Sequence, residues 1–196
     1  MTKKKSHFQN KEPIFEPILQ KIRFSKIKPH IFKDTKVLDL GCGYNASLLH
    51  FFSNEISEGV GVDVSIDKSK ETRKIKLKTK RLDKELKLPK NHFDLVTSLA
   101  VTEHLENPLP MYKTAFKSLK PKGKFILTTP SPSAKPILEF LSFKLGVVSK
   151  QEIADHKKYY VTEEIYKLLE KAGFNPKKIK VSLFLFGVNT FALAEK

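Results

Sequence analysis

The chain has 196 residues, a mass of 22.4 kDa and 40% hydrophobic residues, which together predict one globular domain, residues 1–196, with a buried core. No run of about 18 apolar residues is present, no apolar segment follows the basic N-terminus, and Cys42 is the single cysteine. We therefore expect a cytoplasmic protein with no transmembrane segment, no signal peptide and no internal disulfide.

The formal net charge of +16 is carried almost entirely by lysine, because only three of the 37 basic residues are arginine. Arginine recognises phosphate and guanine through two parallel hydrogen bonds, so its scarcity disfavours a nucleic-acid partner. The lysines are also spread along the chain, over residues 68–90, 113–124 and 177–180. The sequence favours a solvated lysine surface and leaves open an anionic partner or a membrane surface.

Helices and strands are expected to alternate through the first 130 residues. Residues 1–12 are polar and expected to be loosely ordered, and a leading amphipathic helix is expected within residues 13–30. The apolar runs predict strands at 36–40, 59–63, 74–78, 93–99 and 124–129, helices at 46–52 and 108–119, and a turn at 120–123. The run 74–78 alternates lysine with aliphatic residues, which is typical of an edge strand.

The last third of the chain predicts two further helices and a hairpin. Residues 134–148 form an apolar stretch that fits either a core helix or a cover over an acceptor or lipid site. The next helix is expected to begin with Thr162 as its N-cap and to end at Gly173. Strands at 179–185 and 188–194 complete a doubly wound, mostly parallel, Rossmann-like α/β sheet of about seven strands, with an antiparallel hairpin at its C-terminal edge.

The most informative stretch joins the first strand to the first internal helix. Gly41 and Gly43 follow the apolar strand directly, and glycine allows both a sharp turn and close approach of a ligand to the main chain. Asp63 ends the next strand, which places a carboxylate where it can accept hydrogen bonds from a ribose. Strand, glycine turn, helix, strand and terminal aspartate together predict a site for a nucleoside-containing cofactor.

Asp39 separates two readings of this site. The glycines and Ala46 also satisfy the fingerprint of a nicotinamide-dinucleotide site. However, Asp39 stands two residues before Gly41, where its carboxylate would oppose a pyrophosphate and suit a cation. S-adenosylmethionine carries an ammonium and a sulfonium group and no phosphate, so the sequence favours it.

Several segments, in order, resemble the motifs of class I S-adenosylmethionine-dependent methyltransferases, of the small-molecule, methyltransferase type 11-like kind. The segments are Val37–Gly43, Gly59–Asp63, Leu86–Asp94, Glu103–Leu105, Leu119–Gly123, and Asp155–Tyr160 with Ala172–Phe174. The resemblance covers residues 31–174 and implies a single Rossmann-like domain with S-adenosyl-L-methionine as cofactor. Asn45 departs from the pattern, because many members have a third glycine there, but asparagine also tolerates left-handed geometry.

The resemblance also implies roles for individual residues. Asp39 and the backbone of Gly41 and Gly43 would hold the methionine end of the cofactor, and Asp63 would hold the ribose hydroxyls. The other residues expected to line the cofactor site are Cys42, Val64, Asp83, Leu99 and Ala100, with Asp83 on the adenine side.

Two histidines are candidates for proton transfer, which a hydroxyl acceptor requires and pure alignment of donor and acceptor does not. His104 follows the fourth strand and His156 lies in the late loop, and each either moves a proton or braces the structure around the site. No His-Glu-x-x-His or clustered His/Cys pattern occurs, so no metal is predicted.

We therefore expect an enzyme that methylates a hydroxyl, or an amine, of a small molecule, sugar or lipid-linked acceptor. Two alternatives remain: an RNA methyltransferase, suggested by the net charge of +16, and a non-catalytic, cofactor-binding partner subunit. The oligomeric state is left open.

Overall fold

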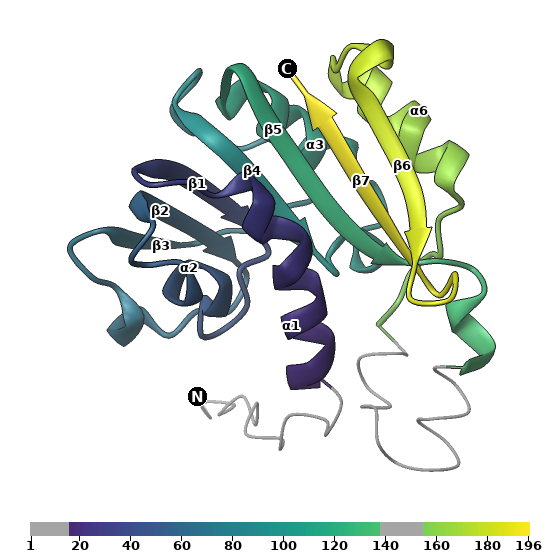
Figure 1. Ribbon diagram of the computed structural model, residues 1–196, viewed down its shortest axis with the longest axis horizontal. Coiled ribbons are helices and arrows are strands. Elements are labelled where there is room, and N and C mark those ends of the chain that lie inside the picture. Colours follow the sequence, from purple (N-terminus) through teal and green to yellow (C-terminus); the bar gives the residue numbers. More distant parts are fainter. Residues whose placement is uncertain (1–15, 138–154) are drawn as a thin grey trace, which may run out of the picture.

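A seven-stranded sheet forms the centre of the computed structural model, which describes residues 16–137 and 155–196 (Figure 1). The strands are β1 (Thr35–Leu40), β2 (Ile56–Asp63), β3 (Ile75–Thr79), β4 (Phe93–Leu99), β5 (Leu119–Pro130), β6 (Ile179–Phe184) and β7 (Asn189–Glu195). Their order across the sheet is β3-β2-β1-β4-β5-β7-β6, and β1 to β5 run parallel. The predicted Rossmann-like, mostly parallel α/β fold is confirmed, with β3 at one edge as expected.

The predicted antiparallel C-terminal hairpin lies at the other edge of the sheet, with its second strand, β7, one position inside that edge. β7 pairs antiparallel with β5 on one side and with β6 on the other, so β6 is the edge strand. The burial pattern gives the reason. β7 buries every second residue, including Ala192 and Ala194, whereas β6 is half-buried or exposed beyond Ile179.

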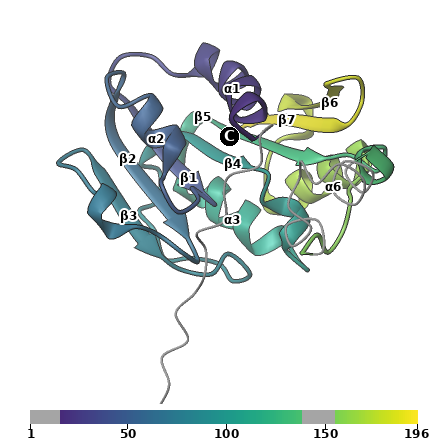
Figure 2. The same cartoon turned by 90° about the horizontal axis from the view of Figure 1, so that it is seen from below.

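Helices cover both faces of the sheet, as Figure 2 shows: α1 (Glu16–Ile27) and α2 (Ser47–Phe51) lie on one face, and α3 (Leu109–Ser118) and α6 (Thr162–Ala172) on the other. Each pair of helices buries its own apolar cluster against the strands. The first cluster includes Phe24, Ile27, Leu48 and Leu49, and the second includes Met111, Tyr112, Ile165 and Leu169. Within the described residues, no helix combines the length and the apolar character that a membrane span requires.

Two local predictions were misplaced. Residues 120–123, predicted as a turn before the strand, lie inside β5 as a bulge, because Phe93 pairs with Leu119 while Leu95 pairs with Lys124. The N-cap of α6 is Val161, not Thr162, and the Val161 N–H donates to Glu164 Oε2 at 3.2 Å. Residues 1–12, predicted to be loosely ordered, lie outside the described residues, as does most of the apolar stretch 134–148.

Candidate functional site

The glycine turn after β1 is held in a shape that only glycine accommodates easily. Gly41 has a φ of +85°, and its N–H donates to the Val62 carbonyl at 2.7 Å. A Cβ at this position would lie 2.1 Å from a methyl group of Val101. Gly43 has a φ of +69°, and a Cβ there would meet no atom within 4 Å. Gly41 is therefore required for packing, whereas Gly43 leaves open space beside the main chain.

Asp63 connects the end of β2 to this turn. Its Oδ2 accepts a hydrogen bond from the Gly43 N–H at 2.9 Å, and its Oδ1 accepts one from the Ser65 N–H at 3.1 Å. Both carboxylate oxygens thus orient backbone at the carboxyl end of the sheet, where ligands bind in open α/β folds. The predicted pair of Gly43 and Asp63 is brought together.

Asp39 is a buried carboxyl group at the end of β1, only 3% exposed. Its Oδ1 accepts a hydrogen bond from Thr97 Oγ1 at 2.7 Å. Burial raises the pKa of Asp39 to about 7; the Thr97 hydrogen bond opposes that rise, and the charge of Asp63 adds to it. A carboxyl group in this state gains most from a positively charged neighbour, because a cation favours its ionised form.

The residues between Gly41 and α2 fill the turn. Cys42 is buried, and its Sγ would lie 2.8 Å from a Cβ at Gly61, so the side chain packs over β2. Burial raises the pKa of the Cys42 thiol far above its usual range, which leaves it protonated and a poor nucleophile. Ala46, the N-cap of α2, has a left-handed φ of +48°.

The remaining predicted cofactor residues lie at the ends of β2, β3 and β4 or on the segments that follow these strands. Val64 is 61% exposed directly after Asp63. Leu99 and Ala100 are half-buried, and the Ala100 N–H donates to the Thr128 carbonyl at 2.9 Å. Asp83 accepts a hydrogen bond from Arg81 Nε at 3.0 Å through Oδ2, while its Oδ1 is buried and has no hydrogen-bond partner.

A pocket of about 350 Å³ lies between the ends of β2 and β3 and the segment after Asp83. Its lining residues are Val62, Lys78, Lys80, Glu85, Leu86, Lys87 and Leu88. None of these was a predicted site residue. Two of them, Val62 and Glu85, are close in sequence to the predicted cofactor residues Asp63 and Asp83.

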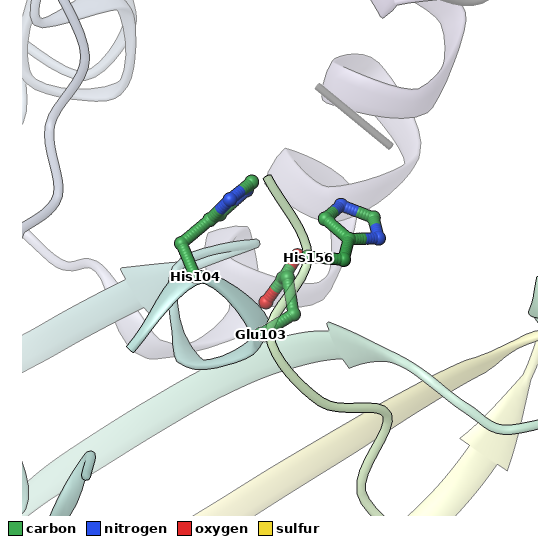
Figure 3. Close-up of side chains that lie close together, drawn as sticks. All are labelled: Glu103, His104 and His156. Carbon is green, nitrogen blue, oxygen red and sulfur yellow. The ribbon is translucent and has the colours of Figure 1, made fainter. Parts of the chain in front are cut away.

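His104 and His156 come together although 52 positions separate them in the sequence. Their ring centroids are 4.8 Å apart, and the buried Glu103 lies beside them (Figure 3). Glu103 and His104 belong to the short 3-10 helix Thr102–His104 after β4, and the Lys157 N–H donates to the Glu103 carbonyl at 2.7 Å. This backbone bond ties the late loop to the turn that follows β4.

Both histidines are biased toward their neutral form. Burial is the main cause that lowers the pKa of His104, against the opposing effect of Asp155. Burial and the neighbouring His104 lower the pKa of His156 to about 4. At neutral pH each ring therefore presents a nitrogen lone pair, which can accept a proton or bind a cation.

A family model described as a methyltransferase domain matches residues 12–178 of the chain. The chain belongs to this family. It is a methyltransferase that uses S-adenosyl-L-methionine as its methyl donor.

Relatives of the methyltransferase include O- and N-methyltransferases. It is 26% identical over 201 residues to a ubiquinone biosynthesis O-methyltransferase of Rickettsia bellii, covering 91% of this chain and 78% of that one. It is 29% identical over 148 residues to a phosphoethanolamine N-methyltransferase of Triticum aestivum, covering 71% of this chain and 28% of that one.

Solved structures agree with the fold of the methyltransferase. An S-adenosylmethionine-dependent methyltransferase from Mesorhizobium loti superposes with a TM-score of 0.67 at 19% identity, covering 88% of this chain and 95% of that one. Phosphoethanolamine N-methyltransferase 2 of Haemonchus contortus, solved with S-adenosyl-L-methionine, gives a TM-score of 0.67 at 14% identity, covering 90% and 52%.

Sequence reasoning missed three residues that shape the site of the methyltransferase. Thr97 was read only as part of a strand, yet its hydroxyl holds Asp39. Glu103 was quoted only as part of a motif, yet it is 1% exposed beside both histidines. Tyr159, whose hydroxyl lies 2.9 Å from His156 Nδ1, was included only within the motif segment Asp155–Tyr160. The position of Glu103 next to His104, shortly after a strand, could have indicated its site role from the sequence.

Proposed function

We propose that the methyltransferase transfers a methyl group to a hydroxyl, or an amine, of a small molecule, sugar or lipid-linked acceptor. The observation that carries this proposal is the pair of neutral histidines at the carboxyl end of the sheet, with ring centroids 4.8 Å apart. The charge of Asp63 acts on His104, so the pair lies within electrostatic reach of the glycine turn. The O- and N-methyltransferases among the relatives support the same acceptor chemistry.

The residues around the glycine turn fit the cofactor. We assign the ribose hydroxyls to Asp63, and the methionine end to Asp39 with the backbone of Gly41 and Gly43. The open space at Gly43 supports this assignment, as does the buried carboxyl of Asp39, which gains from a cationic partner. Cys42, Val64, Leu99 and Ala100 would complete the lining.

Asp83 is the residue we assign to the adenine side. Its Oδ1 is buried and lacks a hydrogen-bond partner, which is costly unless a donor is supplied. An exocyclic amino group is a donor of the required kind.

The chemistry of the site follows from these residues. S-adenosylmethionine, when bound, supplies a methyl group made electrophilic by its sulfonium. The chain aligns the acceptor with that methyl group, and alignment accounts for much of the acceleration of such a displacement. A hydroxyl acceptor must also lose its proton, and the free ring nitrogen of His104 or His156 would accept it.

A labelled-methyl assay tests the acceptor class. The wild-type chain and the Asp63→Ala variant are incubated with labelled S-adenosylmethionine and, separately, a phenol, an aliphatic alcohol, phosphoethanolamine and transfer RNA. We expect label on a hydroxyl or amine acceptor with the wild type and much less label with the variant. Label confined to RNA would contradict this proposal and support the RNA methyltransferase alternative. The net charge of +16 is the reason for testing that alternative.

If no acceptor is labelled, binding of the demethylated cofactor, measured by calorimetry, shows whether the protein is folded and its cofactor site intact. A wild type that binds it and methylates none of these compounds in any buffer would contradict the proposed acceptor class. The cytoplasmic location and the single domain over residues 1–196 stay predictions.

A further inference from the structure

Glu103, His104 and His156 form a group of three possible metal ligands. Each offers one ligand atom, and these atoms all lie within 4.8 Å of one another (Figure 3). We propose that this cluster binds a divalent first-row transition-metal ion such as Zn²⁺. The binding of the ion requires neither the cofactor nor the acceptor.

The two histidines are oriented as metal-binding histidines usually are, with one ring nitrogen held by the protein. Tyr159 Oη lies 2.9 Å from His156 Nδ1, and His104 makes a hydrogen bond with the backbone of Asp155. The second nitrogen of each ring then remains for an ion. Such outer partners fix the ring orientation and raise the basicity of the ligand.

Glu103 supplies the carboxylate from a rigid position. Its side chain is 1% exposed, and Oε2 accepts a hydrogen bond from Thr129 Oγ1 at 3.0 Å. Its backbone carbonyl accepts from the N–H groups of Lys157 at 2.7 Å and Lys158 at 3.4 Å. These bonds hold the segment that carries His156 against the turn that carries Glu103.

The ligand set matches the chemistry of the ion. Two imidazoles and one carboxylate suit zinc and other borderline metals, whereas magnesium prefers oxygen ligands and water. Tetrahedral bonds of about 2.1 Å place ligand atoms roughly 3.4 Å apart, so the present spread of at most 4.8 Å needs only a modest side-chain rotation. His104 lies at the solvent-exposed side of the cluster, so its side chain can shift without displacing core residues.

A role for the ion in the reaction rests on the proposed function. Three protein ligands leave a coordination position open, and an acceptor hydroxyl bound there would have a lower pKa. Its proton would then pass to water, and the histidine nitrogens would act as ligands instead of proton acceptors.

Metal titration tests the site on the untagged, full-length chain. After removal of metal with a chelator, Zn²⁺ is titrated by calorimetry and Co²⁺ by visible absorption. We expect one ion per chain and visible bands typical of four- or five-coordinate Co²⁺. His104→Ala and His156→Ala should each weaken binding by at least about tenfold and abolish the bands, because each removes a ligand.

Two controls separate this result from other causes. His92→Ala removes a histidine that pairs with Glu58 at 2.8 Å elsewhere, so it should leave the affinity unchanged. Asp63→Ala should keep Zn²⁺ binding while it binds the demethylated cofactor about 10-fold to 100-fold more weakly, which distinguishes failure of the metal site from failure of the proposed function. His104→Ala is expected to fold, because His104 is more exposed than His156. A wild type that binds no Zn²⁺, or a double histidine variant that binds as the wild type does, would overturn the proposal.

Discussion

The carboxylate of Asp63 accepts a hydrogen bond from the backbone N–H of Gly43 at 2.9 Å, across the ends of two neighbouring parallel strands. The same carboxylate accepts the Ser65 N–H at 3.1 Å. One side chain thus orders both the glycine turn and the loop after β2. Any ligand held by Asp63 is placed directly beside the open backbone of Gly43.

Asp63→Ala should weaken binding of S-adenosylhomocysteine by about 10-fold to 100-fold, because hydrogen bonds to a charged carboxylate contribute about 1.5–3 kcal/mol. Calorimetric titration measures the change. Asp67→Ala is the matched control, since Asp67 also accepts a backbone N–H, that of Ser69 at 3.0 Å, but caps a separate 3-10 turn. Equal losses in both variants would contradict a specific role for Asp63.

Alanine at the two turn glycines should separate packing from binding. Gly41→Ala should destabilise the fold by about 2–4 kcal/mol, because a Cβ would lie 2.1 Å from Val101 in a left-handed conformation. Gly43→Ala should cost only about 1–2 kcal/mol in denaturant unfolding but should impair cofactor binding, because its Cβ enters open space. Adding Val101→Ala should restore part of the stability of Gly41→Ala and none of the affinity of Gly43→Ala. A Gly43 variant with unchanged affinity would place the cofactor elsewhere.

The buried carboxyl of Asp39 should make stability fall as pH rises. Its pKa is raised to about 7 in the folded chain from 3.8, so between these values the folded state binds more protons than the unfolded state. The unfolding free energy therefore decreases with pH across this window, by an amount on the order of 3 kcal/mol. Denaturant unfolding at pH 5 and pH 8 should show Asp39→Asn gaining stability relative to the wild type at the higher pH. A constant difference between the two proteins would show that Asp39 does not titrate there.

Cofactor binding should release protons near neutral pH. The pKa of Asp39 is raised to about 7, and a bound ammonium or sulfonium would favour the ionised carboxylate. The calorimetric heat of binding S-adenosylmethionine at pH 6.5 should therefore depend on the ionisation enthalpy of the buffer. This dependence should disappear in Asp39→Asn; if it persists unchanged, another group releases the proton.

Much of the fold was readable from local patterns. The strand at 93–99 and the helix that ends at Gly173 are predictable because a short, mostly apolar run and a left-handed cap, here at φ +114°, leave direct marks on the sequence. The start of β5 was not predictable, because the bulge depends on which residue of β4 pairs with each residue of β5. The sequence predicted the C-terminal edge hairpin, but not which of its two strands pairs with β5, because pairing partners carry no local signal.

For the candidate site, chain order alone determined that Asp39, Gly41, Gly43 and Asp63 would lie near one another. Parallel strands joined through helices end at the same edge of a sheet, so residues at strand ends converge whatever the details of packing. Tertiary structure alone decided that Thr97 holds Asp39 and that His156 faces Glu103 and His104. These contacts link segments about 50 or more positions apart, and the path of a loop over the sheet depends on packing that no local pattern records.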